Sequence, residues 1–450
     1  MTGAQAEVLI VGAGPAGLAA AIALREAGVG RVVVADREPE PGGVPRHTGH
    51  LGFGLRDLHR TGSGPAYAAA YAARAARLGV DLRAATSILG WGGESGRHGE
   101  GRLSVELTGP AGVGTVTARA LLLATGCRER PRAARLVPGD RPLGVLTTGA
   151  LQQLVHLHHQ PVGRRAVVVG AEHVSYSALL TLAHAGAATV ALVTEEPRHQ
   201  TFPAFHAAAR LRWRVPVLTR TRVSAVLGRP RVEAVELTDL RTNEARRVPC
   251  DTVVFTGDWI PDHELARHLG LAIDPATRGP LVDQRLRASV PGVFAAGNLL
   301  HGAETADVAA LEGRHAAAAV RDFLATGVWP ADPSVPVRCD PPLRWVAPGA
   351  IVPGAGPPPC GWFTLRTAEF LDHARLEARQ GQRLLWSNRH RHLVPTRAIH
   401  AHAPWIAQID PTAGPVTFSV CGSPRGWPPS PWLGPAPEAT LGSVDNAPPK

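Results

Sequence analysis

Three glycines near the N-terminus, Gly12, Gly14 and Gly17, have the spacing of a dinucleotide-binding turn. An apolar strand, 8–11, leads into them, and a helix-forming run, 18–27, follows at once. In such a turn the first glycine permits a tight bend, the second lets a pyrophosphate approach the backbone, and the third lets helix and strand pack closely. The helix N-terminus supplies N–H groups and partial positive charge for the phosphates.

A second strand, 32–35, ends in Asp36, whose carboxylate can accept hydrogen bonds from a ribose diol. A glycine triplet alone is weak evidence. Here strand, helix, second strand and acid stand in the required order, so we predict a dinucleotide-binding site.

A second strand–turn–helix pattern follows at 166–185, but its turn is altered. Glu172 stands at the position of the second glycine and Ser175 at that of the third. A Cβ blocks close backbone approach there, and a carboxylate repels a pyrophosphate by about 1–4 kcal/mol. Either the site has lost NAD(P)H, or the fold is kept for packing with Glu172 bonded to backbone. Both alternatives predict poor nicotinamide binding. Glu195 and Glu196 would suit a ribose, so NAD(P)H stays a doubtful second cofactor.

Strand and helix patterns alternate along most of the chain and predict an α/β fold with two Rossmann-like domains. We expect a β-meander between 80 and 124, a buried strand at 291–298 and an alanine-rich helix at about 304–324. Beyond 340 short alternating segments, with a hairpin at 380–382, predict a small, mostly β appendage.

The composition is that of a globular protein, with 44% hydrophobic residues. The formal net charge of +10 comes almost entirely from arginine, since Lys450 is the only lysine. These arginines are dispersed, and no basic block is interleaved with aromatic residues. We therefore expect no nucleic-acid partner.

The five cysteines are far apart and form no C-x-x-C pair, which argues against a dithiol, a zinc site or an iron–sulfur cluster. Paired histidines, at 156–159, 390–392 and 400–402, lack a carboxylate or cysteine to complete a metal site, so we predict no metal. No apolar run reaches about 20 residues, so no transmembrane segment is expected. The N-terminus is not a signal peptide, and we expect a cytoplasmic protein.

The order of these motifs resembles the pyridine-nucleotide disulfide oxidoreductase class of flavoproteins. In that class the first nucleotide domain binds FAD, and the second is inserted into it. Finer strings are similar to the flavin (alpha) subunits of opine and amino-acid dehydrogenases, hydrogen cyanide synthase and sarcosine oxidase; these strings lie at 42–47, 52–57, 124–131 and 304–314. The resemblance implies FAD, a small amine or amino-acid substrate, and an electron-accepting partner subunit.

The resemblance also implies the residues that hold FAD: Gly12, Gly14, Pro15, Ala16, Gly17, Asp36, Arg37, Gly43, Arg46, Ala124, Thr125, Gly126, Gly297, Asn298, Thr305 and Ala306. Asn298 departs from the class, which has aspartate there to bond the ribityl chain. An amide can still bond a hydroxyl, so we expect FAD to bind. The helix after Asn298 would stabilise the charge of reduced flavin.

Two histidines, His47 and His50, flank the loop expected to approach the flavin, and either could accept an amine proton as the catalytic base. The alternative is that they bond the loop backbone. Glu304 and Asp307 could bind a substrate ammonium or cap the helix, and capping is the preferred interpretation. Cys127 is expected to pack rather than react.

We expect these domains: an FAD-binding domain in two parts, 1–150 and 257–328; an inserted NAD(P)-like domain, 151–256; a linker, 329–342; a β-rich C-terminal domain, 343–421; and a disordered tail, 422–450. The function we expect is FAD-dependent oxidation of a C–N bond in an amine, imine or amino acid. The alternatives are an NAD(P)H-dependent flavin reductase that feeds an electron carrier, and a non-catalytic FAD-bound scaffold subunit.

Overall fold

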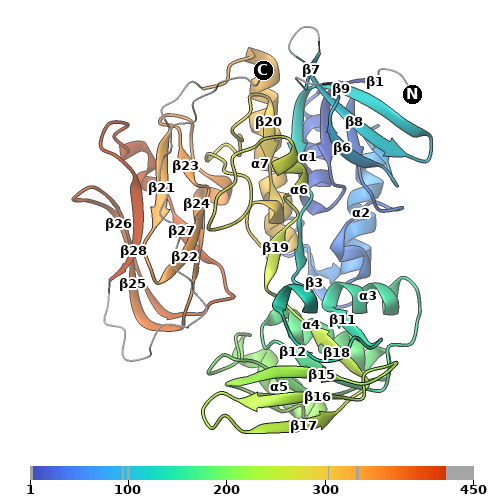
Figure 1. Cartoon of the computed structure of the whole chain (residues 1–450). Coiled ribbons are helices and arrows are strands. Elements are labelled where there is room, and N and C mark those ends of the chain that lie inside the picture. Colours follow the sequence, from blue (N-terminus) through green and yellow to red (C-terminus); the bar gives the residue numbers. More distant parts are fainter. Residues whose placement is uncertain (1–3, 94–95, 99–101, 303, 331–333, 422–450) are drawn as a thin grey trace, which may run out of the picture.

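The computed structural model describes residues 4–93, 96–98, 102–302, 304–330 and 334–421. It has three parts, seen in Figure 1 as an upper right, a lower right and a left-hand region. The expected tail, 422–450, lies outside the described residues.

The first part is built on a sheet whose strands run in the order β5-β2-β1-β9-β8-β6. Strand β9 joins its halves, because its C-terminal half pairs in parallel with β1 while its N-terminal half pairs antiparallel with β8. Strand β20, almost 170 residues later in the chain, adds to the free side of β9. The bounds are β1 Ala4–Val11, β2 Val32–Ala35, β5 Asp81–Arg83, β6 Ser87–Trp91, β7 Arg97–His98, β8 Arg102–Gly109, β9 Gly112–Leu123 and β20 Val293–Ala295.

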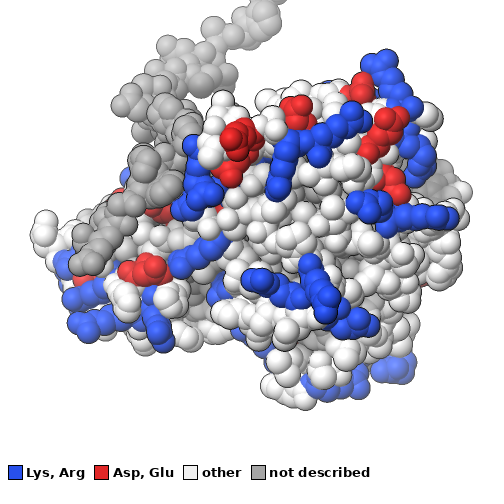
Figure 2. All heavy atoms as spheres, turned by 90° about the horizontal axis from the view of Figure 1, so that it is seen from below, with Lys and Arg blue, Asp and Glu red and all other residues white. Residues whose placement is uncertain are grey.

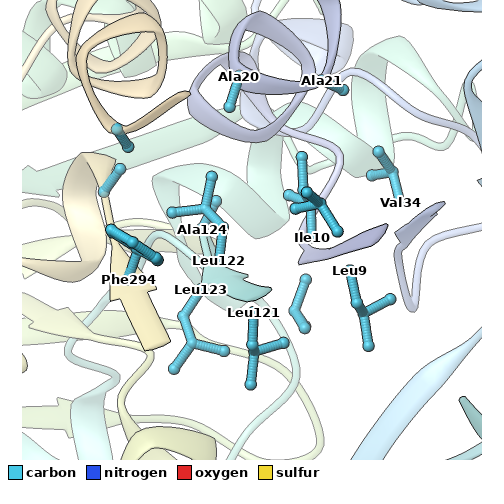
Figure 3. Packing of buried hydrophobic residues seen from close by; sticks show 14 of the residues in the cluster. Leu9, Ile10, Ala20, Ala21, Val34, Leu121, Leu122, Leu123, Ala124 and Phe294 are labelled. Atoms are coloured by element: carbon cyan, nitrogen blue, oxygen red, sulfur yellow. The ribbon is translucent and has the colours of Figure 1, made fainter. Parts of the chain in front are cut away.

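Helices α1 (Pro15–Glu26) and α7 (Ala306–Thr326) pack against each other beside this sheet, and α2 (Gly64–Arg77) packs on α1. Their contact needs glycine, because a Cβ on Gly313 would lie 2.0 Å from the carbonyl oxygen of Ala16. Branched side chains of β1, β2 and β9 fill the core under α1, as Figure 3 shows. Their burial on both faces explains the continuous apolar runs.

The second part holds a parallel sheet of order β11-β18-β12-β13-β14 and a three-stranded antiparallel sheet, β15-β16-β17. Helix α4 packs on β12 and β13, and α3 packs on α4. The bounds are β11 Val145–Thr147, α3 Thr148–His156, β12 Arg165–Val169, α4 His173–His184, β13 Ala188–Val193, α5 Pro203–Trp213, β14 Val217–Leu218, β15 Thr221–Leu227, β16 Ala234–Asp239, β17 Ala245–Pro249 and β18 Thr252–Phe255.

The chain enters and leaves this second part through a two-stranded ribbon, β10 (Cys127–Glu129) paired with β19 (Trp259–Pro261). The second dinucleotide-type domain is therefore inserted into the first, as the motif order predicted. Its sheet begins at β11, a few residues before the expected boundary at 151.

The third part is strand-rich, with one sheet of order β23-β21-β28-β25-β26 and another of order β22-β24-β27. One apolar cluster, which includes Phe363, Trp405 and Phe418, is buried in this part. The expected hairpin joins β25 and β26. The bounds are β21 Val335–Cys339, β22 Leu343–Ala347, β23 Ala350–Ile351, β24 Trp362–Thr367, β25 Leu371–Gln380, β26 Arg383–Leu393, β27 Ile399–His402 and β28 Val416–Cys421.

Strand β21 lies inside the stretch 329–342 that we expected to be a linker. Val335 and Val337 are buried while Pro336 and Arg338 are exposed, and β21 pairs with β28. The proline and aspartate content of this stretch concealed a short alternating strand. The linker prediction is therefore wrong for these residues.

Arginine side chains are spread over the face seen in Figure 2 rather than gathered in one patch. Several arginines pair with carboxylates, such as Arg222 with Glu195 at 2.9 Å and Arg229 with Asp140 at 3.0 Å. Among the described residues no helix is long and apolar enough to cross a membrane.

Candidate dinucleotide sites

The first glycine turn is held by contacts that only glycine allows. Gly12 has φ +106°, and a Cβ there would lie 2.3 Å from the carbonyl oxygen of Ala124. A Cβ on Gly17 would lie 1.9 Å from the carbonyl oxygen of Gly12. These two glycines therefore fix the turn between β1 and α1 and its contact with the end of β9.

Gly14 differs from its neighbours, because a Cβ built on it meets no atom within 4 Å. It is the N-cap of α1, no side chain caps that helix, and Pro15 occupies the first turn. Gly43 lies opposite Gly14, because a Cβ built on Gly43 would lie 2.9 Å from the Cα of Gly14. The result is a space at the N-terminus of α1 that is bordered by the backbone of Gly14 and Gly43. This space, the phosphate cradle, fits the pyrophosphate of FAD.

Asp36 lies at the end of β2 and accepts backbone hydrogen bonds from Ala13 (2.5 Å) and Glu38 (2.8 Å). The bond from Ala13 holds Asp36 against the glycine turn, and the carboxylate keeps further lone pairs that can accept a bond from a ribose hydroxyl. Arg37 pairs with Asp262 at 3.0 Å.

The 124–126 turn lies against the return crossing of the chain. Thr125 donates its hydroxyl to the carbonyl of Asp262 (2.8 Å), and the amide of Asp262 donates to the carbonyl of Gly126 (2.9 Å). Arg46 lies beside the cradle, with its guanidinium on the Glu40 carbonyl. The structure thus brings the predicted residues of 12–17, 36–46 and 124–126 together.

Gly297 and Asn298 follow β20 and complete this cluster. A Cβ on Gly297 would lie 2.8 Å from the Cβ of Ala16, and its amide donates to Glu312 (2.9 Å). Asn298 holds the next loop by bonding both the amide (2.8 Å) and the carbonyl (3.1 Å) of Glu304. That loop delivers Thr305, the N-cap of α7, which makes no side-chain cap bond. Ala306 opens the helix.

The two histidine candidates differ in position. His47 is only 6% exposed and lies where the 44–47 turn packs on α3, next to Gln152. Burial, together with the neighbouring Arg46 charge, lowers the pKa of His47 to about 4. His50 is half-buried, its ring is tilted against that of Phe53 with centroids 5.5 Å apart, and its Nδ1 donates to the carbonyl of Leu51 (2.8 Å). The contact of His50 matches the alternative in which a loop histidine bonds the backbone, whereas His47 faces the Gln152 side chain and its Nδ1 makes no hydrogen bond within the described residues.

Asp307 neither caps α7 nor faces an open site. Its carboxylate accepts the amides of Gly54 (3.0 Å) and Arg56 (2.8 Å) and so fixes the 52–57 loop on the helix. The capping interpretation is therefore wrong for Asp307.

In the second turn, between β12 and α4, the carboxylate of Glu172 occupies the place where a pyrophosphate would approach the backbone. Glu172 accepts hydrogen bonds from the amide of Ala171 (2.9 Å) and the hydroxyl of Thr256 (2.6 Å). Ser175 accepts the amide of Glu172 (3.2 Å) and meets the Thr256 hydroxyl at 2.7 Å. Only 9% of Glu172 is exposed. The alternative in which Glu172 bonds the backbone matches this geometry.

A second buried carboxylate, Glu129 of β10, lies close by, since both it and Glu172 border Gly257. It accepts the amides of Gly149 (2.8 Å) and Gly257 (3.3 Å). A Cβ on Gly257 would lie 2.4 Å from a carboxylate oxygen of Glu172, which shows how closely that side chain fills the turn. Burial raises the pKa of Glu129. A pyrophosphate would meet carboxylates in place of open backbone, so these residues do not fit a dinucleotide.

Sequence reasoning missed the side chains that the third part of the chain adds around the start of α7. His400, on β27, faces Glu304, and Arg366, on β24, is buried beside Trp345. Contacts between residues so distant in sequence leave no local pattern, although the unusual run His400-Ala401-His402 was visible. Among the described residues no group of three metal-ligating side chains is brought together.

A family model described as pyridine nucleotide-disulphide oxidoreductase matches residues 6–313, more than half of the chain. The chain belongs to this family. The family is one of FAD-binding flavoproteins with two dinucleotide-type domains, and the cradle at Gly14 fits that cofactor. Strand-rich residues 335–421 lie beyond the match.

Two curated relatives are similar at low identity. An opine oxidase subunit of Agrobacterium tumefaciens (strain Ach5) is 27% identical over 365 residues, which cover 74% of this chain and 69% of that protein. The sarcosine oxidase alpha subunit of Rhizobium meliloti (strain 1021) is 27% identical over 277 residues, 59% of this chain and 26% of that protein.

Among solved structures, T. acidophilum thioredoxin reductase superposes with a TM-score of 0.60 at 21% identity and covers 72% of this chain and 99% of its own. L-proline dehydrogenase from P. horikoshii gives a TM-score of 0.53 at 17% identity and covers 74% of this chain and 58% of its own. These likenesses show the fold. The chain is an FAD-dependent oxidoreductase of this family.

Proposed function

We propose that this protein oxidises a C–N bond of an amine or amino acid, with the organic substrate as the reductant. FAD, when bound, supplies the hydride acceptor. The observation that carries the proposal is Glu172, whose carboxylate fills the turn where a nicotinamide dinucleotide would place its pyrophosphate. The names of the relatives, opine oxidase and sarcosine oxidase, support amine chemistry.

The contrast between the two turns is the basis of the argument. At the first turn the space beside Gly14 is open, and no side chain caps the N–H groups at the N-terminus of α1. At the second turn Glu172 has taken the donors of Ala171 and Thr256. This contrast supports a retained FAD site and a blocked second site, with electrons entering from a small molecule rather than from NAD(P)H.

The side chains support hydride chemistry mainly by position. Helix α7 begins next to Gly297 and Asn298, with an N-terminus that no side chain caps. When FAD is bound, the N–H groups and dipole of that end would stabilise negative charge on its ring. Removal of a hydride from the substrate also requires a neutral amine nitrogen, so a proton acceptor must lie close by.

One specific observation favours a second candidate. Both curated relatives are named as subunits, so this chain could serve as the FAD-bound subunit of a complex whose partner holds the substrate site.

Anaerobic titration of the purified FAD-loaded protein separates these functions. We expect secondary amines and amino acids to bleach the flavin absorbance and NADH and NADPH to leave it unchanged. Bleaching by nicotinamide alone would point to a flavin reductase and contradict the proposal. Bleaching by amines only after a partner protein is added would favour the scaffold role.

A further inference from the structure

Glu304 is a buried acid placed between the start of α7 and the strand-rich part of the chain. Its side chain is 6% exposed, and its Oε1 atom makes no hydrogen bond within the described residues. The nearest basic group is His400 of β27, whose Nε2 lies 3.9 Å from that oxygen and is likewise without a hydrogen-bond partner there. Buried polar atoms without partners are rare and ask for an explanation.

The separation of these two atoms suits a bridging ligand. At 3.9 Å they are too far apart for a direct hydrogen bond. An atom about 2.8 Å from each would subtend roughly a right angle at itself, which an amine nitrogen with two N–H groups can approach. A protonated amine could donate one N–H to the carboxylate and the other to a neutral imidazole.

The walls around the pair are aromatic. Trp362 stacks on the His400 ring with centroids 4.5 Å apart, and Trp345 stacks on His301 at 5.0 Å. His301 also lines a small cavity with Trp362, and its Nδ1 is a third buried atom without a hydrogen bond in the described residues. Arg366 already lies 5.8 Å from the centroid of the Trp345 ring, as expected where indole faces favour cations.

The pair is also connected to the predicted flavin residues. Asn298 bonds both backbone groups of Glu304, and Thr305, the next residue, is the N-cap of α7. The His400 side chain is 24% exposed, whereas its Nε2 atom, which faces the carboxylate, is buried.

We propose that Glu304 and His400 form the subsite for the nitrogen of the amine substrate, with Glu304 holding the ammonium and His400 taking its proton. This inference rests on the proposed amine oxidation. In the step, an N–H bond of the ammonium breaks and the proton goes to His400 Nε2. The substrate C–H bond would then break with its electron pair passing as hydride to FAD, while the nitrogen lone pair forms the C=N bond of the iminium (protonated imine) product.

The electrostatic surroundings keep the free imidazole neutral, so the lone pair of its Nε2 atom can accept an N–H of the substrate. Burial, with the charge of Arg56, lowers the pKa of His400 to about 4. Burial raises the pKa of Glu304, and a cation bonded to the carboxylate would oppose this. The charged or titratable groups that face His400 are Arg56, His301, Glu304, Arg366 and His402.

The test follows His400 directly by NMR of the FAD-loaded protein labelled in its histidine rings, with the His400 signal assigned by its loss in His400→Asn. N-methylglycine and L-proline, both secondary amines, are the probes. We expect a saturable shift of the His400 signal with each probe that binds. Glu304→Gln keeps the side-chain shape and should weaken binding about tenfold or more, since it removes a charged hydrogen bond.

His402→Asn is the matched control, because His402 lies on the same strand, is exposed and contacts the edge of Trp362. It should leave probe binding unchanged. Flavin content and thermal unfolding of each variant show whether it folds. The inference is overturned if amines bleach the flavin while the His400 signal stays fixed, or if Glu304→Gln and His402→Asn behave alike; the proposed function survives both outcomes. If no amine bleaches the flavin, the proposed function fails as well.

Discussion

Replacement of Glu172 tests whether the second turn is blocked by charge and volume. Glu172→Gly removes a carboxylate that lies where a pyrophosphate would approach and restores the glycine of the fingerprint. Two unit charges about 4 Å apart repel by about 4 kcal/mol at an effective dielectric constant of 20. Relief of half to all of this corresponds to about 30-fold to 1000-fold tighter NAD(P)H binding.

The same change has a cost that can be worked from the structure. Glu172 accepts a 2.6 Å hydrogen bond from Thr256, and loss of a hydrogen bond to a charged group removes about 1.5–3 kcal/mol. We therefore expect a lower unfolding temperature for Glu172→Gly. FAD content should be unchanged, because Gly12, Gly14 and Gly17 lie in a different part of the fold.

Glu172→Gln is the matched control for volume, since it removes the charge and keeps the shape. NADPH affinity measured by calorimetry should rise for Glu172→Gln by the part that is due to charge, and rise further for Glu172→Gly, which also removes the volume of the side chain. The reasoning is refuted if the unchanged protein already binds NADPH as tightly as a folded Glu172→Gly variant, or if that variant gains no affinity at all.

Two further predictions concern the first site and acid stability. Gly14→Ala should fold normally but bind FAD about tenfold or more weakly, because its Cβ enters open space where the phosphates approach. Gly17→Ala should instead destabilise the fold, because its Cβ would lie 1.9 Å from the carbonyl oxygen of Gly12. Equal unfolding temperatures for the two variants would disprove the distinction. His47 takes up a proton near its usual 6.5 in the unfolded chain but only near 4 in the fold, so the free energy of unfolding should fall as pH drops through this window, by up to about 3 kcal/mol from this residue. His47→Gln should flatten that slope in urea unfolding at several pH values, and an unaltered slope would show that His47 is not buried in neutral form.

Local pattern predicted the framework well. The glycine turn at Gly12, the long helix after Asn298 and the inserted second domain all depend on short-range signals, namely turn glycines and apolar periodicity. The sequence also raised the question of Glu172. It left open whether Glu172 repels a ligand or bonds its own backbone, because the residue type is glutamate in both cases.

What the sequence could not show depends on contacts between distant segments. The Glu304–His400 pair joins residues almost a hundred positions apart, and the strand β21 is defined by its pairing with β28 and with β23. The prediction that Asp307 caps α7 failed for the same reason, since its partners, the amides of Gly54 and Arg56, come from the other end of the chain.

Anaerobic stopped-flow reduction of the bound flavin tests the central claim most directly. The substrate would be an amine found to bleach the flavin, compared with the same amine deuterated at the carbon next to nitrogen. The account predicts that the amine reduces the flavin, that deuteration slows the bleaching, and that NADPH at the same concentration leaves the flavin oxidised. Rapid reduction by NADPH, with no reduction by any amine, would contradict it.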